Sequence, residues 1–218
     1  MSKTSATTGR AQSAGEEIAN SISHGVGALA AIMAIPVLIV GALRDGGTSN
    51  VVGAAIFGVT LLLLYLASTI YHALPPGKAK RVFMLLDHSA IFLLIAGTYT
   101  PFTLGVLRGA WGWGLFGAVW GLALLGVLAK ARFGVRHQAL STGLYLAMGW
   151  LVLVAVKPLM TLVPLSGLLW LLAGGLAYTL GVVFFVLDSR VRYAHFVWHL
   201  FVVSGSLCHF MAVFWYAV

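Results

Sequence analysis

Charged residues are scarce in this chain. Of its 218 residues, only 8% are Asp, Glu, Lys or Arg and 61% are hydrophobic, whereas a soluble domain is usually about one quarter charged. The single cysteine, Cys208, excludes an intramolecular disulfide and a cysteine metal cluster. The net charge is +8, but the basic residues stand in short groups between apolar runs, a pattern that indicates membrane topology rather than nucleic-acid binding. We therefore expect an integral membrane protein that binds no nucleic acid.

Seven apolar segments are long enough to cross a bilayer, because a hydrocarbon core about 30 Å thick needs roughly 20 apolar residues in a helix. They are residues 20–43, 50–73, 82–106, 110–130, 138–157, 164–187 and 194–217. Continuous runs of this length argue against a β-barrel. The sequence predicts an all-α membrane protein, a seven-helix transmembrane bundle over residues 16–218. It also predicts a disordered tail over residues 1–15, which is too polar for a secretory signal peptide.

Lysine and arginine are distributed unequally between the two sides of this bundle. One side carries ten of them: Lys3, Arg10, Lys78, Lys80, Arg81, Lys130, Arg132, Arg136, Arg190 and Arg192. The other side carries three: Arg44, Arg108 and Lys157. Because basic loops stay in the cytoplasm, we expect a cytoplasmic N-terminus and a C-terminus outside.

Small residues spaced four apart occur in the fourth and fifth segments. Gly117 and Gly121 form one pair, and Gly143 and Ala147 form the other. Because such pairs let helix backbones approach each other, we expect close helix packing at both.

Ionisable side chains inside the segments gather at one predicted depth. His195 and His199 are four residues apart and project from one helical face, although such pairs also arise by chance near membrane surfaces. His72 lies near the end of the second segment and Asp87 near the start of the third, both close to the predicted cytoplasmic surface. Ionisable residues in a span are costly and are by default a functional hypothesis.

Three imidazoles with a fourth position left open are typical of a catalytic zinc site. We therefore predict a Zn²⁺ site formed by His72, His195 and His199; a hydrogen-bonded polar network that ties the helix ends together is the alternative. Asp87 would be a fourth ligand, or would hold a water and act as general base. Ser68, one turn from His72, would hydrogen-bond the water or Asp87, or serve in helix packing.

The remaining polar residues receive weaker assignments. Glu17, Asn20 and His24 share one face of the first segment, where they either support the histidines or cap and link the helix, and we favour the structural role. His88 points about 100° away from Asp87, and His209 lies about 15 Å deeper than His199, which favours helix packing. We expect His137 and Asp188 to be solvated in loops.

Four motifs in order resemble those of a known family. They are Glu17 to His24, Ser68 to His72, Asp87 with its neighbours, and His195 to His199 with His209 beyond. From about Glu16 to the end, the chain resembles the progestin and adipoQ receptor family, most closely its bacterial hemolysin III branch. The resemblance implies zinc ligation by His72, His195 and His199, with Asp87 contacting the bound water.

The same resemblance implies, through ceramide-hydrolysing relatives, a metal-dependent hydrolase of a membrane lipid amide in the bacterial inner (plasma) membrane. Membrane lipids would then be its partners. The alternatives are a non-enzymatic, zinc-stabilised regulator of membrane lipid homeostasis and a membrane-lytic hemolysin.

Overall fold

The computed structural model describes residues 10–218, and their regular structure is helical throughout. The elements are α1 (Ala14–Asp45), α2 (Thr48–Ala73), α3 (Lys78–Pro101), the π-helix η1 (Phe102–Leu107), α4 (Gly109–Phe133), α5 (Gln138–Trp150), the 3-10 helix η2 (Leu151–Ala155), α6 (Val156–Leu162), α7 (Leu165–Leu187) and α8 (Ala194–Tyr216). With η1 continuing α3, and η2 and α6 continuing α5, seven helical segments within residues 10–218 are long and apolar enough to span a membrane. The predicted all-α, seven-span class is confirmed.

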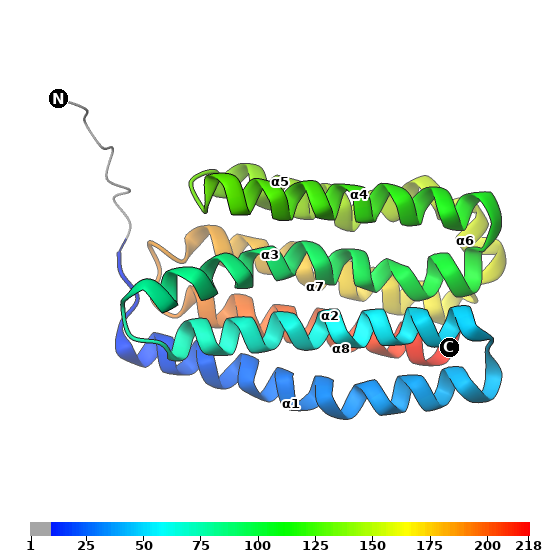
Figure 1. Cartoon of the computed structure of the whole chain (residues 1–218), viewed down its shortest axis with the longest axis horizontal. Helices are drawn as coiled ribbons and strands as arrows, with labels where there is room; N and C mark the ends of the chain where they lie inside the picture. The colour runs from blue at the N-terminus through cyan, green and yellow to red at the C-terminus, as the bar shows by residue number, and fades with distance from the viewer. Residues whose placement is uncertain (1–9) are drawn as a thin grey trace.

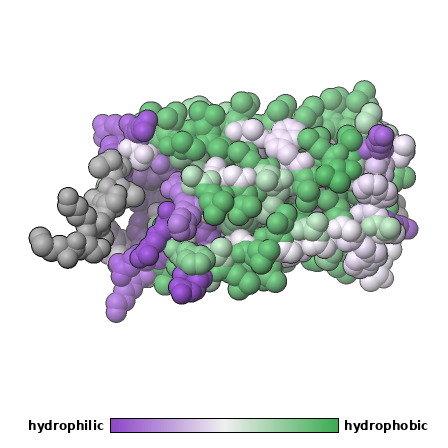
Figure 2. All heavy atoms as spheres, turned by 90° about the horizontal axis from the view of Figure 1, so that it is seen from above, coloured by the Kyte–Doolittle hydropathy of each residue, from purple (hydrophilic) through white to green (hydrophobic). Residues whose placement is uncertain are grey.

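The helices run side by side along the long axis of the molecule (Figure 1). α1 packs against α2 and α8, α2 also packs against α3, and α7 packs against α8. α4 and α5 lie on the far side of α3 and α7 from α1 (Figure 1). Hydrophobic side chains cover most of the length of the face in Figure 2, whereas hydrophilic side chains gather toward the end near residue 10. Such a surface suits a protein surrounded by lipid.

One end of the bundle is basic. It is formed by residues 10–13 and by the loops between α2 and α3, α4 and α5, and α7 and α8, and we call it the basic end (Figure 1). All the lysines and arginines assigned to the cytoplasmic side lie here except Lys3, which falls outside the described residues. The cytoplasmic orientation of this end stays a prediction.

The first helix begins two residues before the predicted domain boundary at residue 16. Residues 1–9 of the predicted disordered tail lie outside the described residues. α1 begins at Ala14, because Ser13 caps it: the Ser13 side chain accepts a hydrogen bond from the Glu16 N–H, and Glu16 reaches back to the Ser13 backbone.

The fifth span is broken at residue 151, where α5 gives way to η2. The Tyr99 hydroxyl of α3 lies 2.8 Å from the carbonyl oxygens of Met148 and Gly149, to which it donates. Its oxygen also accepts a hydrogen bond from the Val152 N–H at 2.8 Å. Irregular backbone within a membrane needs such partners from the protein, so Tyr99 stabilises the break.

The predicted close packing at the small-residue pairs is wrong. A Cβ built on Gly117, Gly121 or Gly143 would meet nothing within 4 Å, and these positions are exposed. Helices instead approach at other glycines: a Cβ on Gly126 would lie 2.5 Å from the Phe92 ring, and one on Gly97 would clash with Thr60. Spacing alone does not distinguish a lipid-facing glycine from a buried one.

Candidate metal centre

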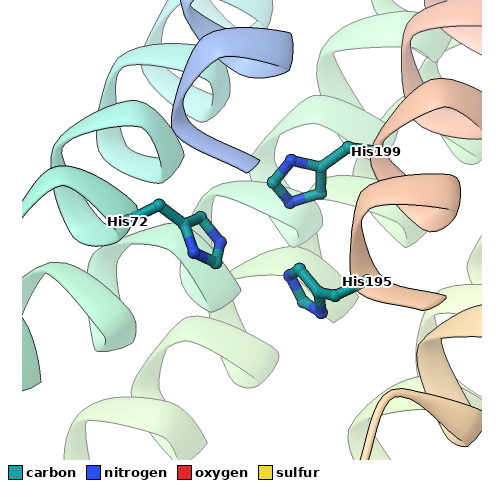
Figure 3. A group of neighbouring side chains, drawn as sticks. All are labelled: His72, His195 and His199. Carbon is teal, nitrogen blue, oxygen red and sulfur yellow. The ribbon is translucent and has the colours of Figure 1, made fainter. Parts of the chain in front are cut away.

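Three histidines from two helices meet near the basic end. His72 lies in the last turn of α2, and His195 and His199 lie in the first turns of α8. Each has one ring nitrogen within 4.8 Å of a ring nitrogen of the other two, and all three side chains are buried. Figure 3 shows the three rings turned toward a common centre. The structure thus brings together the three histidines that the sequence predicts as ligands.

Each of these rings has its Nδ1 beside an oxygen acceptor. His72 Nδ1 lies 2.7 Å from Glu17 Oε2, and His195 Nδ1 lies 3.0 Å from Asp188 Oδ2. His199 Nδ1 lies 3.1 Å from the backbone oxygen of Asn20. Because carboxylate and carbonyl oxygens only accept, Nδ1 is the protonated nitrogen in each neutral ring, and the lone pair is on Nε2.

This tautomer suits metal ligation. A metal-binding imidazole almost always donates its second N–H to a carboxylate or carbonyl oxygen, which fixes the ring and raises its basicity. In addition, His72 Nε2 is buried without a hydrogen-bond partner. An unpaired buried acceptor costs about 1–3 kcal/mol, a penalty that a bound cation would remove. The residues present therefore fit a zinc ion, since neutral imidazoles are common zinc ligands.

α1 supports this centre at three positions on one face. Glu17 and the Asn20 backbone accept the hydrogen bonds from His72 and His199, as described above. The His24 ring stacks on His199, with centroids 3.5 Å apart and planes 8° apart. Glu17 also pairs with Lys80, with Oε1 and Nζ 2.9 Å apart. The sequence left two roles open for Glu17, Asn20 and His24: supporting the histidines, or capping and linking the helix. The geometry favours support of the histidines.

The loop between α7 and α8 is held by the N-terminal segment. The Glu16 carboxylate accepts hydrogen bonds from both terminal nitrogens of Arg10 and, at 2.8 Å, from the Tyr193 N–H. These bonds raise the pKa of Arg10 above its ordinary value. Tyr193 has a left-handed backbone, φ 58°, immediately before α8. Glu16 therefore fixes the turn from which His195 projects.

Asp87 and Ser68, the other two candidate site residues, are both buried. Ser68 is fully buried, and its hydroxyl oxygen has no hydrogen-bond partner. Asp87 lines a cavity of about 370 Å³ that also borders His195, His199 and His24. His88, expected to point away, lines the same cavity without belonging to the three-histidine cluster. Asp87 and the imidazoles of His24, His88, His195 and His199 thus line one cavity, whereas His72 and Ser68 are not among its lining residues.

The cavity continues from the histidines into the apolar interior of the bundle. Beyond the basic end its lining is almost entirely hydrophobic and comes mainly from α3, α5 to α6, α7 and α8. Leu153, Met160 and Leu172 line it and are also exposed on the outer surface, with Met160 65% exposed. The cavity therefore opens sideways between the broken fifth span and α7, toward the region that lipid would occupy.

Comparison with known proteins shows the family of this chain. The family model described as "Haemolysin-III related" matches residues 12–210. The chain belongs to this family. It is 46% identical over 203 residues to "Hemolysin-3" of Bacillus cereus, which covers 93% of this chain and 92% of the relative. It is 45% identical to the "Hemolysin-3 homolog" of Bacillus subtilis, over 93% of this chain and 95% of the relative.

A more distant human relative extends the comparison beyond bacteria. The human "Monocyte to macrophage differentiation factor" is 28% identical over 213 residues, which are 92% of this chain and 84% of the relative. The resemblance to the hemolysin III branch of the progestin and adipoQ receptor family is thus confirmed.

Sequence reasoning missed two acidic residues of this haemolysin-III-related chain. Asp188, expected in a solvated loop, supports His195, and Glu16 was assigned no role. Neither contact leaves a periodic signal in the sequence. Asp188 acts across a loop, and Glu16 contacts Tyr193, which is 177 residues away in the chain. The Ser13 to Glu16 spacing of a capping box is the one signal that marks Glu16.

Proposed function

We propose that this protein is a zinc-dependent hydrolase of a membrane lipid amide. The observation that carries the proposal is that Asp87 and two members of the three-histidine cluster, His195 and His199, line one end of a long apolar cavity that opens toward lipid. A site of this kind combines a polar reaction centre with space for a hydrocarbon chain. The resemblance to ceramide-hydrolysing relatives supplies the reaction class.

His72, His195 and His199 would hold the ion, and Glu17, Asp188 and the Asn20 carbonyl would keep their rings in the ligating orientation. When bound, zinc polarises a carbonyl and lowers the pKa of a coordinated water toward about 7. Ser68, one turn from His72 with a free hydroxyl, orients the attacking water. Asp87 accepts a proton from that water as it adds to the carbonyl carbon.

Asp87 then returns this proton to the nitrogen as the C–N bond breaks, so that a fatty acid and an amine leave. The apolar lining fixes the substrate's direction: the amide lies at the histidines and the acyl chain extends away from the basic end. The lateral opening near Met160 lets the lipid enter from the bilayer without crossing water. The burial of the histidines keeps bulk solvent from the reacting groups.

Lysis of membranes is the second candidate, because two relatives carry the name hemolysin. A third is regulation of membrane lipid composition by a zinc-stabilised protein without turnover. Both treat the cluster as structural, so neither requires Asp87 to act as a base.

The test is hydrolysis of a panel of lipid amides, ceramide included, by purified wild-type protein and Asp87→Asn, with His137→Gln as the control. We expect wild type and the control to release fatty acid, and Asp87→Asn to be slower by about 10²–10⁴-fold while retaining zinc. Equal rates in wild type and Asp87→Asn would contradict the mechanism. Red-cell lysis without hydrolysis would favour the hemolysin, and zinc without either activity would favour the regulator.

A further inference from the structure

His209 is an ionisable residue deep in the apolar part of the cavity. It lies on α8 ten residues beyond His199, about 15 Å further along the helix. It is 9% exposed and lines the same cavity, and its Nδ1 has no hydrogen-bond partner. A polar group at such depth is costly when it is left unpaired. Helix packing alone therefore leaves His209 incompletely explained.

Contacts between α7 and α8 fix the position of the His209 ring. Its atoms Nε2, Cδ2 and Cε1 all lie 2.7–2.8 Å from where a Cβ on Gly174 would be, so the ring lies flat on the backbone of α7. Tyr178, one turn along α7, stacks against it with centroids 5.5 Å apart and planes 20° apart. Tyr178 in turn occupies the space beside Gly205 of α8, where a Cβ would lie 2.9 Å from its ring. The His209 ring of α8 thus packs on a glycine of α7, and the Tyr178 ring of α7 packs on a glycine of α8.

The cluster has more hydrogen-bonding capacity than it uses. The Tyr178 hydroxyl and Ser206 Oγ lie 2.9 Å apart. The buried Tyr65 hydroxyl also lies beside Ser206. Three hydroxyl groups carry three protons, and bonds from both tyrosines to Ser206 use two of them, so one O–H remains to donate. Ser206 is three residues before His209 and shares its helical face. A neutral imidazole adds one donor and one acceptor.

The surroundings select an uncharged ligand group. Among the described residues that line the cavity, the only Asp, Glu, Lys or Arg is Asp87, which lies at the histidine end. A charged group beside His209 would therefore be buried without a counter-charge. A hydroxyl group both donates and accepts and would match the free capacity of the cluster.

We infer that Tyr178 and His209, which line the cavity, and Ser206, which contacts Tyr178, form a second binding site, the deep polar site, for a hydroxyl group on the hydrocarbon chain of a lipid whose polar end lies at the three histidines. The separation of about 15 Å is within the length of a long acyl chain. The inference rests on the proposed function in one respect, that the chain of the lipid occupies this cavity. It adds chain hydroxylation as a determinant of ligand choice.

The test measures binding, so it does not depend on turnover. Stearic acid and a mid-chain hydroxystearic acid compete with a fluorescent fatty acid for the purified full-length protein, and neither contains an amide to hydrolyse. The readout is the ratio of their affinities in wild type, in His209→Phe and in His137→Phe, an exposed-loop control. We expect the ratio to favour the hydroxylated acid in wild type and the control, and to fall by about three- to tenfold in His209→Phe, with stearic acid binding unchanged.

Wild type that does not favour the hydroxylated acid, or the same ratio in wild type and His209→Phe, overturns the inference. If His209→Phe does not fold, Ser206→Ala takes its place, with a smaller fall expected and an unchanged ratio again overturning the inference. Protein that binds neither acid also overturns it. The hydrolase proposal fails separately, through absence of lipid-amide hydrolysis in the same preparation.

Discussion

Glu17 and His72 connect the first helix to the three-histidine cluster: Glu17 Oε2 accepts a hydrogen bond from His72 Nδ1 at 2.7 Å. The other oxygen of the same carboxylate pairs with Lys80 at 2.9 Å. Lys80 also donates to the backbone oxygens of Tyr71 and Leu74, at 3.1 Å each, where α2 ends. One acidic side chain thus fixes a candidate ligand and joins α1, α2 and the start of α3.

Loss of the Glu17 charge is expected to weaken zinc binding. Glu17→Gln keeps the shape of the side chain but removes the anion that orients His72 and raises its basicity. We expect zinc affinity to fall by about 10–100-fold, measured by competition with a chelator of known affinity. Lys80→Gln should have a smaller effect, and Lys78→Gln, an exposed neighbour, should have none. Unchanged affinity in Glu17→Gln would show that this contact does not support a metal site.

Asp188 should matter in the same way, through its contact with His195. Asp188→Asn removes the charge beside His195 Nδ1, 3.0 Å away, and we again expect about a 10–100-fold loss of zinc affinity. Arg190→Gln changes an exposed side chain in the same loop and is the matched control. Equal affinities for the two variants would contradict the role assigned to Asp188.

The depth and identity of the candidate ligands could be predicted from the sequence. Membrane spans fix both depth and direction, so His72, Asp87, His195 and His199 could be assigned to one level before any contact was known. The helical class follows from the same constraint, since the backbone of a span must pair with itself. These are inferences from length and spacing, which a linear sequence carries.

Contacts made across loops could not be predicted in this way. Asp188 reaches His195 because of how the chain turns between α7 and α8, and Tyr193 adopts a left-handed backbone there. The sequence also does not show whether a glycine faces lipid or another helix when the span is apolar on all sides. For that reason Gly121 and Gly126 read alike in the sequence and differ in the structure.

The two glycines of α4 provide a matched test of the packing. In Gly126→Ala the new methyl group would lie about 2.5 Å from the buried Phe92 ring, and overpacking of this kind costs about 1–3 kcal/mol. In Gly121→Ala it meets nothing within 4 Å, and better helix propensity should stabilise by up to about 1 kcal/mol. Thermal unfolding in detergent should therefore give opposite shifts in Tm. A lower Tm in both variants would place Gly121 at a contact.

The basic end predicts which way the bundle crosses the membrane. We expect a reporter that is active only outside the cytoplasm to work when fused after Val218 and to fail when inserted near Lys78. A reporter that is active only in the cytoplasm should give the complementary pattern. The reverse result would place the three histidines near the outer surface instead.

The most direct test of the central claim is the metal content of the purified protein. After exposure to excess zinc and removal of the unbound ion, we expect about one zinc per chain in wild type and in His137→Ala. His72→Ala should bind zinc more weakly, the double variant His195→Ala, His199→Ala should bind none, and both should melt at lower temperature than zinc-loaded wild type. Stoichiometric zinc in the double variant, or no zinc in wild type, would contradict the assignment of His72, His195 and His199 as a metal centre.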